Sequence, residues 1–234
     1  MISVPAIAGA PLWATAQSAS QQVMPDGSVV VRRVVSVVAR DSRGRTYGEL
    51  RMRAPMTQAG MGQLVGVCIY DPHTGIRTLY YPGAHTAIQQ IVPERGTPAK
   101  APDALVKVQD LGSKTIDDFA VKGTRRTVVV PAMMTGTGSA ITVVDEYWYS
   151  EELRVNLLQV HSDPRTGTLT MGLSDIKRED PDPTFFKLPP GYHTTDLIGY
   201  APSTGGGVGN GGPPYSIPFS VPGADIPGDI SGAW

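Results

Sequence analysis

Residues 28–40 read SVVVRRVVSVVAR, and this stretch decides the fold class. Seven of its thirteen positions are valine, whose β-branched side chain favours a strand over a helix. Residues 41–44 (DSRG) are typical of a turn, and residues 45–53 then alternate between two sets of side chains. The segment 28–53 therefore predicts an antiparallel hairpin with one buried face and one solvent-exposed face.

The same hairpin carries a row of arginines. Such a row is typical of the solvated face of an edge hairpin, where charge discourages pairing with another sheet. Contact with anionic lipid head groups or an acidic partner is the alternative. The row consists of Arg32, Arg33, Arg40, Arg43, Arg45, Arg51 and Arg53.

The rest of the chain up to residue 200 repeats this pattern of short strands and turns. Turn residues mark segments such as 71–75 and 162–167, and no stretch of about twelve residues has helical spacing of apolar side chains. The sequence predicts an antiparallel sheet of about eight to ten strands, and a sheet of that size tends to curl or close. The further strands are expected at residues 64–70, 76–81, 85–92, 106–116, 120–130, 140–149, 154–161 and 168–177.

Glycine and proline divide the chain into parts. The sequence has 27 Gly and 21 Pro, of which 9 Gly and 6 Pro fall in residues 201–234, where Lys and Arg are absent. A segment of this composition does not bury enough apolar surface to fold alone. We therefore expect an N-terminal extension over residues 1–22, an antiparallel β domain over residues 23–200 and a Gly/Pro-rich tail over residues 201–234.

Charge and cysteine content exclude several functions. The 20 basic and 21 acidic residues leave a net charge of −1, which argues against nucleic-acid binding. The single cysteine, Cys68, excludes an internal disulfide and a cysteine-based metal centre. The sequence contains no apolar run of about 18 residues, so it predicts no transmembrane helix. His161, Ser162 and Asp163 do not form a catalytic triad, because successive strand residues point to opposite faces. We predict no catalytic residues, no metal site and no cofactor, and hence no enzymatic activity.

Four short motifs, in their order and spacing, resemble a group of uncharacterised, secreted, mostly acidobacterial proteins over roughly residues 12–196. They lie at residues 26–27 with 40–46, 111–116 with 123–125, 146–150 with 161–165, and 180–183 with 185–192. The last motif, a Pro-rich acidic turn followed by Phe and Pro-Gly, is also similar to the C-terminal part of LolA/LolB-type lipoprotein carriers. This more distant resemblance implies a curved, incompletely closed antiparallel β-barrel, a LolA-like half-barrel, whose concave face holds acyl chains. The resemblance also implies a periplasmic or secreted location.

These observations lead to one predicted function and one alternative. In the first, a non-enzymatic envelope protein binds a lipid, an acyl chain or a partner segment on its concave face. The residues expected to line that face are Tyr147, Trp148, Tyr149, Leu169 and Met171, although the aromatic residues also fit a core. In the alternative, the protein self-associates through an edge strand or the tail. The tail residues expected to contact a partner are Tyr215, Ile217, Phe219 and Val221.

Overall fold

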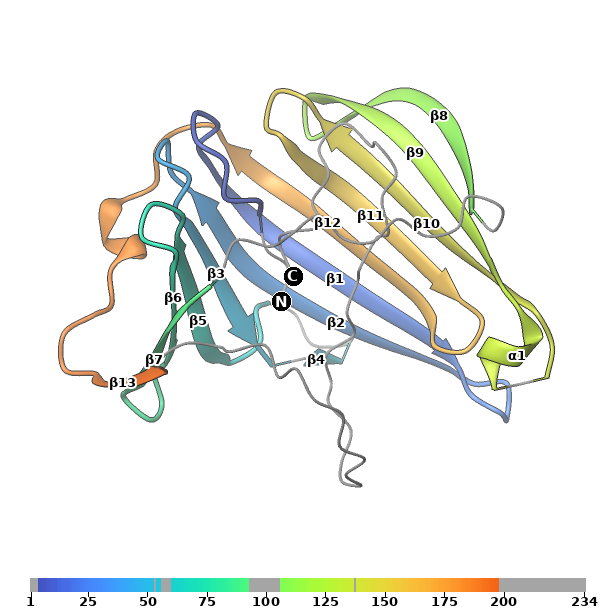
Figure 1. The fold of residues 1–234 in the computed structure, drawn as a ribbon, viewed down its shortest axis with the longest axis horizontal. Helices are drawn as coiled ribbons and strands as arrows, with labels where there is room; N and C mark the ends of the chain where they lie inside the picture. The colour runs from blue at the N-terminus through green and yellow to red at the C-terminus, as the bar shows by residue number, and fades with distance from the viewer. Residues whose placement is uncertain (1–3, 53, 56–59, 93–105, 137, 198–234) are drawn as a thin grey trace.

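One large curved β-sheet dominates the computed structural model, which describes residues 4–197 except 53, 56–59, 93–105 and 137 (Figure 1). The sheet has 13 strands in the order β13-β7-β6-β5-β3-β2-β1-β12-β11-β10-β9-β8, with β4 paired to β2. The strands are β1 (Leu12–Val23), β2 (Val29–Arg40), β3 (Thr46–Arg51), β4 (Ala54–Pro55), β5 (Leu64–Asp71), β6 (Ile76–Tyr81), β7 (Thr86–Ile91), β8 (Val106–Ile116), β9 (Phe119–Val130), β10 (Ile141–Ser150), β11 (Val155–Asp163), β12 (Gly167–Lys177) and β13 (His193–Leu197). The helices among the described residues are α1 (Ala132–Thr135) and the 3-10 helix η2 (Pro183–Phe186).

The predicted fold class is confirmed. The sheet is antiparallel apart from the parallel pair β13–β7, and no pairing among the described residues joins the edge strands β8 and β13. It is therefore an open, curved half-barrel, with more strands than the eight to ten expected. The structure also differs at the N-terminus, where residues 12–23 form β1 instead of an extension. Alanine, serine and glutamine dominate β1, and these residues lack the β-branched signature that revealed β2.

The sheet consists of two meanders joined by a seam in its middle. Strands β2, β3, β5, β6 and β7 follow one another on one side, and β8 to β12 follow one another on the other side. Strand β1 joins them, because it pairs with β2 along its whole length and with β12 from Trp13 to Gln21. The first and last long strands of the described chain are therefore neighbours at the centre of the sheet (Figure 1).

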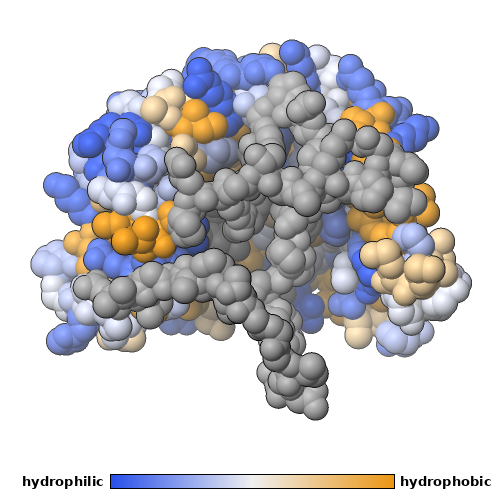
Figure 2. Space-filling model, in the orientation of Figure 1, coloured by the Kyte–Doolittle hydropathy of each residue, from blue (hydrophilic) through white to orange (hydrophobic). Residues whose placement is uncertain are grey.

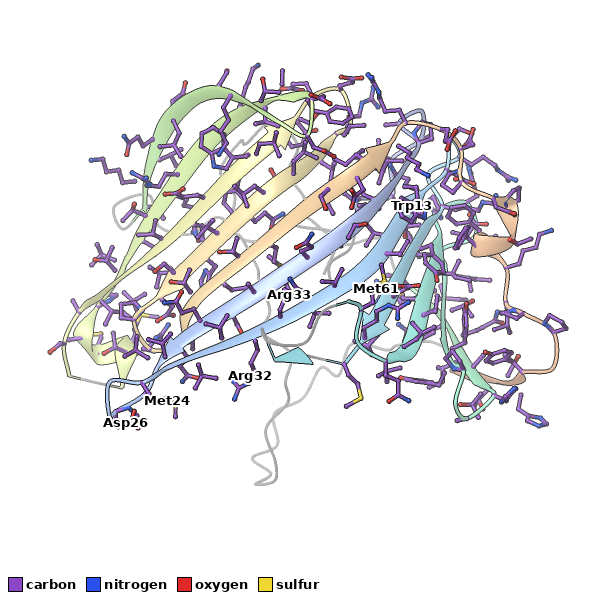
Figure 3. The ribbon with its side chains drawn as sticks, turned by 180° about the vertical axis from the view of Figure 1, so that it is seen from behind. Trp13, Met24, Asp26, Arg32, Arg33 and Met61 are labelled. Atoms are coloured by element: carbon purple, nitrogen blue, oxygen red, sulfur yellow. The ribbon has the colours of Figure 1, made fainter. Side chains whose placement is uncertain are left out.

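The strand registers assign every side chain of the sheet to one of two faces. We call the face with Ala14 and Val38 the inner face and the face with Trp13 and Ala39 the outer face. The N-terminal segment lies against the inner face, which is turned toward the viewer in Figure 1. In Figure 3, which shows the molecule from behind, Trp13 and Arg33 lie on the outer face.

The outer face of the first meander is covered by the segment that carries η2. Phe185 packs edge-to-face on Tyr47 at a centroid distance of 5.0 Å, and Phe186 joins the same buried cluster. Glu49 is also buried there and accepts hydrogen bonds from the Val37 amide and the Tyr47 hydroxyl. The face that was expected to be solvated in hairpin 28–53 is therefore a core, because a segment far along the chain returns to cover it.

The arginines of the hairpin do not form one solvated row. Arg45 binds Asp41 at 2.7 Å and Arg51 binds Glu49 at 2.7 Å, so both are neutralised locally. Arg40 has 0% exposure. Arg32 and Arg43 are exposed, Arg33 is half-buried, and Arg53 lies outside the described residues. The positive face that the sequence suggested is thus divided between ion pairs, the interior and exposed side chains.

Arg40 fastens the N-terminal segment to the inner face. Its Nε donates to the Ala10 carbonyl at 2.7 Å and its Nη1 donates to the Pro5 carbonyl at 2.9 Å. Its Nη2 donates to the carbonyl of Leu153, in the turn between β10 and β11. Burial without a carboxylate partner lowers the pKa of Arg40 to about 10. A second apolar core surrounds this contact and includes Val4, Leu12, Val38, Leu153 and Leu157.

Candidate functional site

Four of the five predicted ligand-lining residues share the inner face of the second meander. In one row across the strands, Tyr147 lies opposite Gln159, Gln159 opposite Met171, and Met171 opposite Ser18. Leu169 lies one row further along β12, on the same face. Tyr147 is 8% exposed, and this burial raises its pKa. Met171 and Leu169 are half-buried, so they are available to form an apolar surface.

Tyr149 is also on this face but Trp148 is not. Tyr149 is buried, two residues from Tyr147 along β10. Trp148 alternates to the outer face, where its ring lies against Gly123 with the Lys114 ammonium 3.7 Å from the ring centroid. The aromatic triplet therefore divides between the two faces, as strand alternation requires.

The central strands present small side chains to the inner face. Along β1 these are Ala14, Ala16, Ser18 and Ser20. Ser36 lies opposite Ala16 on β2, whereas Val38 and Val34 lie opposite Ala14 and Ser18. Larger apolar side chains stand on both sides of this strip, with Met171 and Leu169 on β12 and Leu79 and Ile88 on β6 and β7. Apolar residues are visible on both flanks of this side of the molecule in Figure 2. We call this strip the floor of the candidate site: Ser18 and Ser20 are half-buried there, whereas Ala14 and Ala16 are fully buried in the apolar core.

Cys68 belongs to the same face. Its row runs from Val38 through Gly48 and Cys68 to Leu79. Burial raises the pKa of the thiol, which is the environment of a small apolar side chain rather than of a nucleophile.

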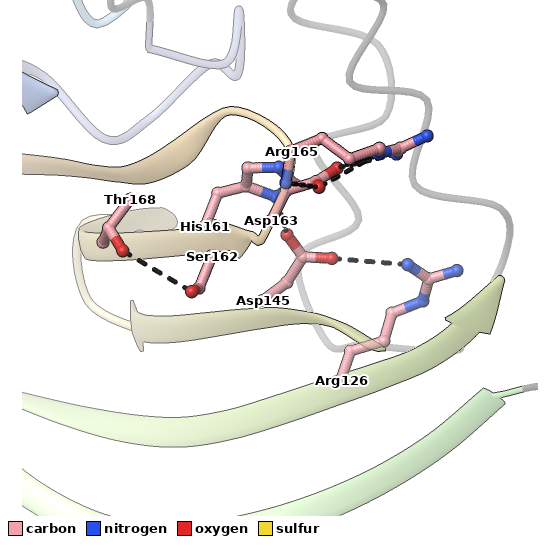
Figure 4. Close-up of polar contacts among 7 residues, drawn as sticks. All are labelled: Arg126, Asp145, His161, Ser162, Asp163, Arg165 and Thr168. Atoms are coloured by element: carbon pink, nitrogen blue, oxygen red, sulfur yellow. Dashed lines mark hydrogen bonds and ion pairs between the residues drawn. The ribbon is translucent and has the colours of Figure 1, made fainter. Parts of the chain in front are cut away.

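A buried charged cluster interrupts the apolar inner face, and the sequence did not reveal it. In the row beside Tyr147, Arg126 lies opposite Asp145, Asp145 opposite His161, and His161 opposite Leu169. The Asp145 carboxylate lies 2.6 Å from His161 Nδ1 and 3.4 Å from Arg126 Nη1 (Figure 4). The partners come from three neighbouring strands, so the register of the sheet creates the cluster.

The neighbours of His161 do not join this cluster. Ser162 points to the opposite face and approaches the Thr168 hydroxyl at 3.5 Å, whereas Asp163 binds Arg165 at 2.7 Å (Figure 4). This agrees with the expectation that residues 161–163 form no triad. Within the described parts of the chain, no group of three or more His, Cys, Asp or Glu side chains is placed to hold a metal ion.

Two expectations concern other regions. The tail residues Tyr215, Ile217, Phe219 and Val221 lie outside the described residues. Among the residues that the structure describes, no helix has the length and apolar character to cross a membrane.

Comparison with known proteins gives similarity of structure only. No family model matches the sequence, and no curated protein matches it. An uncharacterised conserved protein from Thermus thermophilus has a TM-score of 0.45 and 9% identity, over 80% of this chain and 91% of that chain. The MucA/MucB complex of Pseudomonas aeruginosa has a TM-score of 0.43 and 8% identity, over 79% of this chain and 58% of that chain. A LolA superfamily protein from Nitrosomonas europaea has a TM-score of 0.34 and 12% identity, over 78% of this chain and 92% of that chain. A LolA superfamily protein is thus among the solved structures that match this chain, at low identity and a low TM-score.

Proposed function

We propose that this protein is a non-enzymatic component of the cell envelope, periplasmic or secreted, that binds a lipid or acyl chain on its inner face. The observation that carries the proposal is the strip of small side chains on β1, with half-buried apolar side chains on β12 to one side and on β6 and β7 to the other. Ser18 on β1 lies between Met171 on β12 and Val34 on β2, and Ala16 lies between Leu173 and Ser36.

Physical chemistry supports an apolar occupant for this floor. Four apolar side chains of this face are half-buried, namely Met171, Leu169, Leu79 and Ile88. A ligand that removes their remaining apolar surface from water lowers the free energy of the complex. Binding sites for small molecules are typically concave and mostly apolar, with few polar groups. The inner face combines half-buried apolar side chains with the small polar Ser18 and Ser20. Arg126, Asp145 and His161 form a polar group at one end of the rows.

A pair of neighbouring substitutions tests the proposal. Ser18→Trp places a large ring on the floor, whereas Ala19→Trp places the same ring on the outer face, opposite Arg33 and Thr170. The neutral dye N-phenyl-1-naphthylamine serves as the apolar probe, and its fluorescence reports binding to the wild-type protein and both variants.

We expect the wild-type protein to bind the dye, S18W to bind it about tenfold more weakly or worse, and A19W to bind it like the wild type. A tenfold change corresponds to about 1.4 kcal/mol, which is less than the loss of one buried apolar side chain. Absence of dye binding by the wild type, or equal binding by both variants, contradicts the proposal.

The alternative function, self-association, is favoured by one observation. Strand β8 forms an edge of the sheet, and Val108 on this edge is 50% exposed. An exposed edge strand can pair with another chain. If the edge or the tail makes such a contact, the full chain is an oligomer in solution, and deletion of residues 201–234 or Val108→Lys lowers its mass. A monomeric full chain by light scattering excludes this alternative.

A further inference from the structure

We infer that Arg126 forms a subsite for an anionic oxygen head group, carboxylate or phosphate, of a ligand whose acyl chain lies on the inner face. This inference rests on the proposed function and specifies the class of ligand. The observation behind it is an incompletely satisfied, buried guanidinium at one end of an apolar surface.

Arg126 is buried but not fully paired. It is 6% exposed, and its Nε is a buried donor without a hydrogen-bond partner. A buried polar group without a partner is rare in folded proteins, because the lost hydration is not replaced. A guanidinium has five N–H donors. Among the residues that the structure describes, Asp145 is the side chain that accepts from Arg126, and it meets Nη1.

Asp145 does not saturate Arg126. The distance from Arg126 Nη1 to Asp145 Oδ2 is 3.4 Å, which is longer than the roughly 2.7–2.9 Å typical of a charge-assisted hydrogen bond. The other carboxylate oxygen, Oδ1, lies 2.6 Å from His161 Nδ1. The carboxylate is thus held most closely by His161, and an additional oxygen acceptor is required to satisfy Nε of Arg126.

The surroundings of Arg126 fit the chain of such a ligand. From Arg126 one row leads past Asp145 and His161 to Leu169 on β12. Tyr147 and Met171 lie in the next row. Three strand spacings of about 4.8 Å each separate Arg126 from Leu169, a path of roughly 14 Å. A head group at Arg126 therefore leaves the acyl chain on the surface formed by Tyr147, Met171 and Leu169.

Competition against N-phenyl-1-naphthylamine separates the head group from the chain. Three competitors share one alkyl chain and differ at its end: dodecanoate, dodecyl phosphate and 1-dodecanol. We expect at least one anion to displace the dye from the wild-type protein about tenfold more effectively than the alcohol, because hydrogen bonds to charged groups are stronger than neutral ones. The better anion identifies the head group. Equal potency of all three competitors overturns the inference.

Two adjacent arginines provide the variant and its control. Arg126→Met removes the donors on the inner face, whereas Arg125→Met removes a guanidinium that binds Glu146 at 2.7 Å on the outer face. R126M should lose the tenfold preference for the anion and keep its affinity for 1-dodecanol, and R125M should retain both. An anion preference that survives in R126M overturns the inference.

Two further results keep the tests distinguishable. If the wild type binds neither dye nor competitor, the proposed function fails; if it binds them without preference for an anion, only the head-group inference fails. Circular dichroism checks whether R126M folds. If it does not, Asp145→Asn is the variant to test instead. Removal of the competing carboxylate should tighten dodecanoate binding several-fold and leave 1-dodecanol unchanged, and an unchanged dodecanoate affinity counts against the inference.

Discussion

Arg40→Met should destabilise the protein by releasing its N-terminal segment. The arginine is fully buried and donates to the carbonyls of Pro5, Ala10 and Leu153. Methionine keeps an unbranched apolar side chain in the same place but donates no hydrogen bond. The three carbonyls lose these hydrogen bonds, and that of Pro5 keeps only the one from the Ile7 amide. The perturbation therefore acts on the attachment of residues 4–11 rather than on packing.

The size of the effect follows from two opposing contributions. Hydrogen bonds to a charged group contribute about 1.5–3 kcal/mol each, so three contribute roughly 5–9 kcal/mol. The fall of the Arg40 pKa from 12.5 to about 10 corresponds to roughly 3 kcal/mol of desolvation against the charged form. The difference is about 2–6 kcal/mol, and we expect R40M to lower the free energy of unfolding by about 3–4 kcal/mol.

Urea unfolding measured by circular dichroism, with Arg43→Met as the matched control, checks this value. Arg43 is exposed, so R43M should change stability by less than about 0.5 kcal/mol. Hydrogen exchange should also show faster exchange in residues 4–11 of R40M than in the wild type. A loss below about 1 kcal/mol in R40M would refute the reasoning, because it would mean that desolvation of the guanidinium cancels its three bonds.

Three further predictions concern other buried groups. Gly123→Ala should cost about 1–3 kcal/mol and change tryptophan fluorescence, since its methyl group would lie 2.6 Å from the Trp148 ring; unchanged stability would show that the ring is free to move. Burial raises the pKa of Tyr47 and Tyr147 above that of free tyrosine, so their stabilising effect is full below about pH 10 and is lost as pH rises further. Absorbance at 295 nm should therefore show these two phenolates only as the protein unfolds, which Tyr47→Phe and Tyr147→Phe variants would verify. Burial also raises the pKa of Cys68, so a thiol reagent should react slowly with the native protein and rapidly in denaturant; equal rates would contradict its placement.

The sequence predicted most of the sheet because most strands carry their own signal. β2 is rich in valine, and β12 alternates leucine and methionine with threonine and serine, so each is recognisable without knowledge of its neighbours. β1 has no such signal, because its inner face is built from alanine and serine. The feature that hid β1 in the sequence is the one that forms the floor of the candidate site.

The charged cluster could not be predicted because it depends on one β-bulge. Near the turn, Ser150 pairs with Val155 and Tyr149 with Asn156, and this register would place Asp145 opposite Val160 on β11. The shift between Trp148 and Tyr149 moves β11 by one residue and brings His161 opposite Asp145 instead. A bulge of this kind inverts which side chains share a face.

The burial of Tyr47 and Glu49 was unpredictable for a different reason. Their alternation with Thr46 and Leu50 indicates correctly that they share a face. Which face is solvated depends on Phe185 and Phe186, which are more than 130 residues away in the chain. The neighbouring contact between Ser42 and Asp180 spans a similar separation of 138 residues. Local pattern determines the two faces of a strand but not what covers them.

The seam between β1 and β12 has a consequence for the order of folding. Each meander pairs strands that are close in the sequence, so its contacts are local and can form while the chain is still being synthesised. The seam forms only when Trp13 pairs with Lys177, which closes a loop that contains almost the entire described chain. Until β12 leaves the ribosome, β1 exposes an unpaired edge of alanine and serine, side chains that offer little apolar surface to another nascent chain. The composition of β1 thereby suits the strand that must wait longest for its partner.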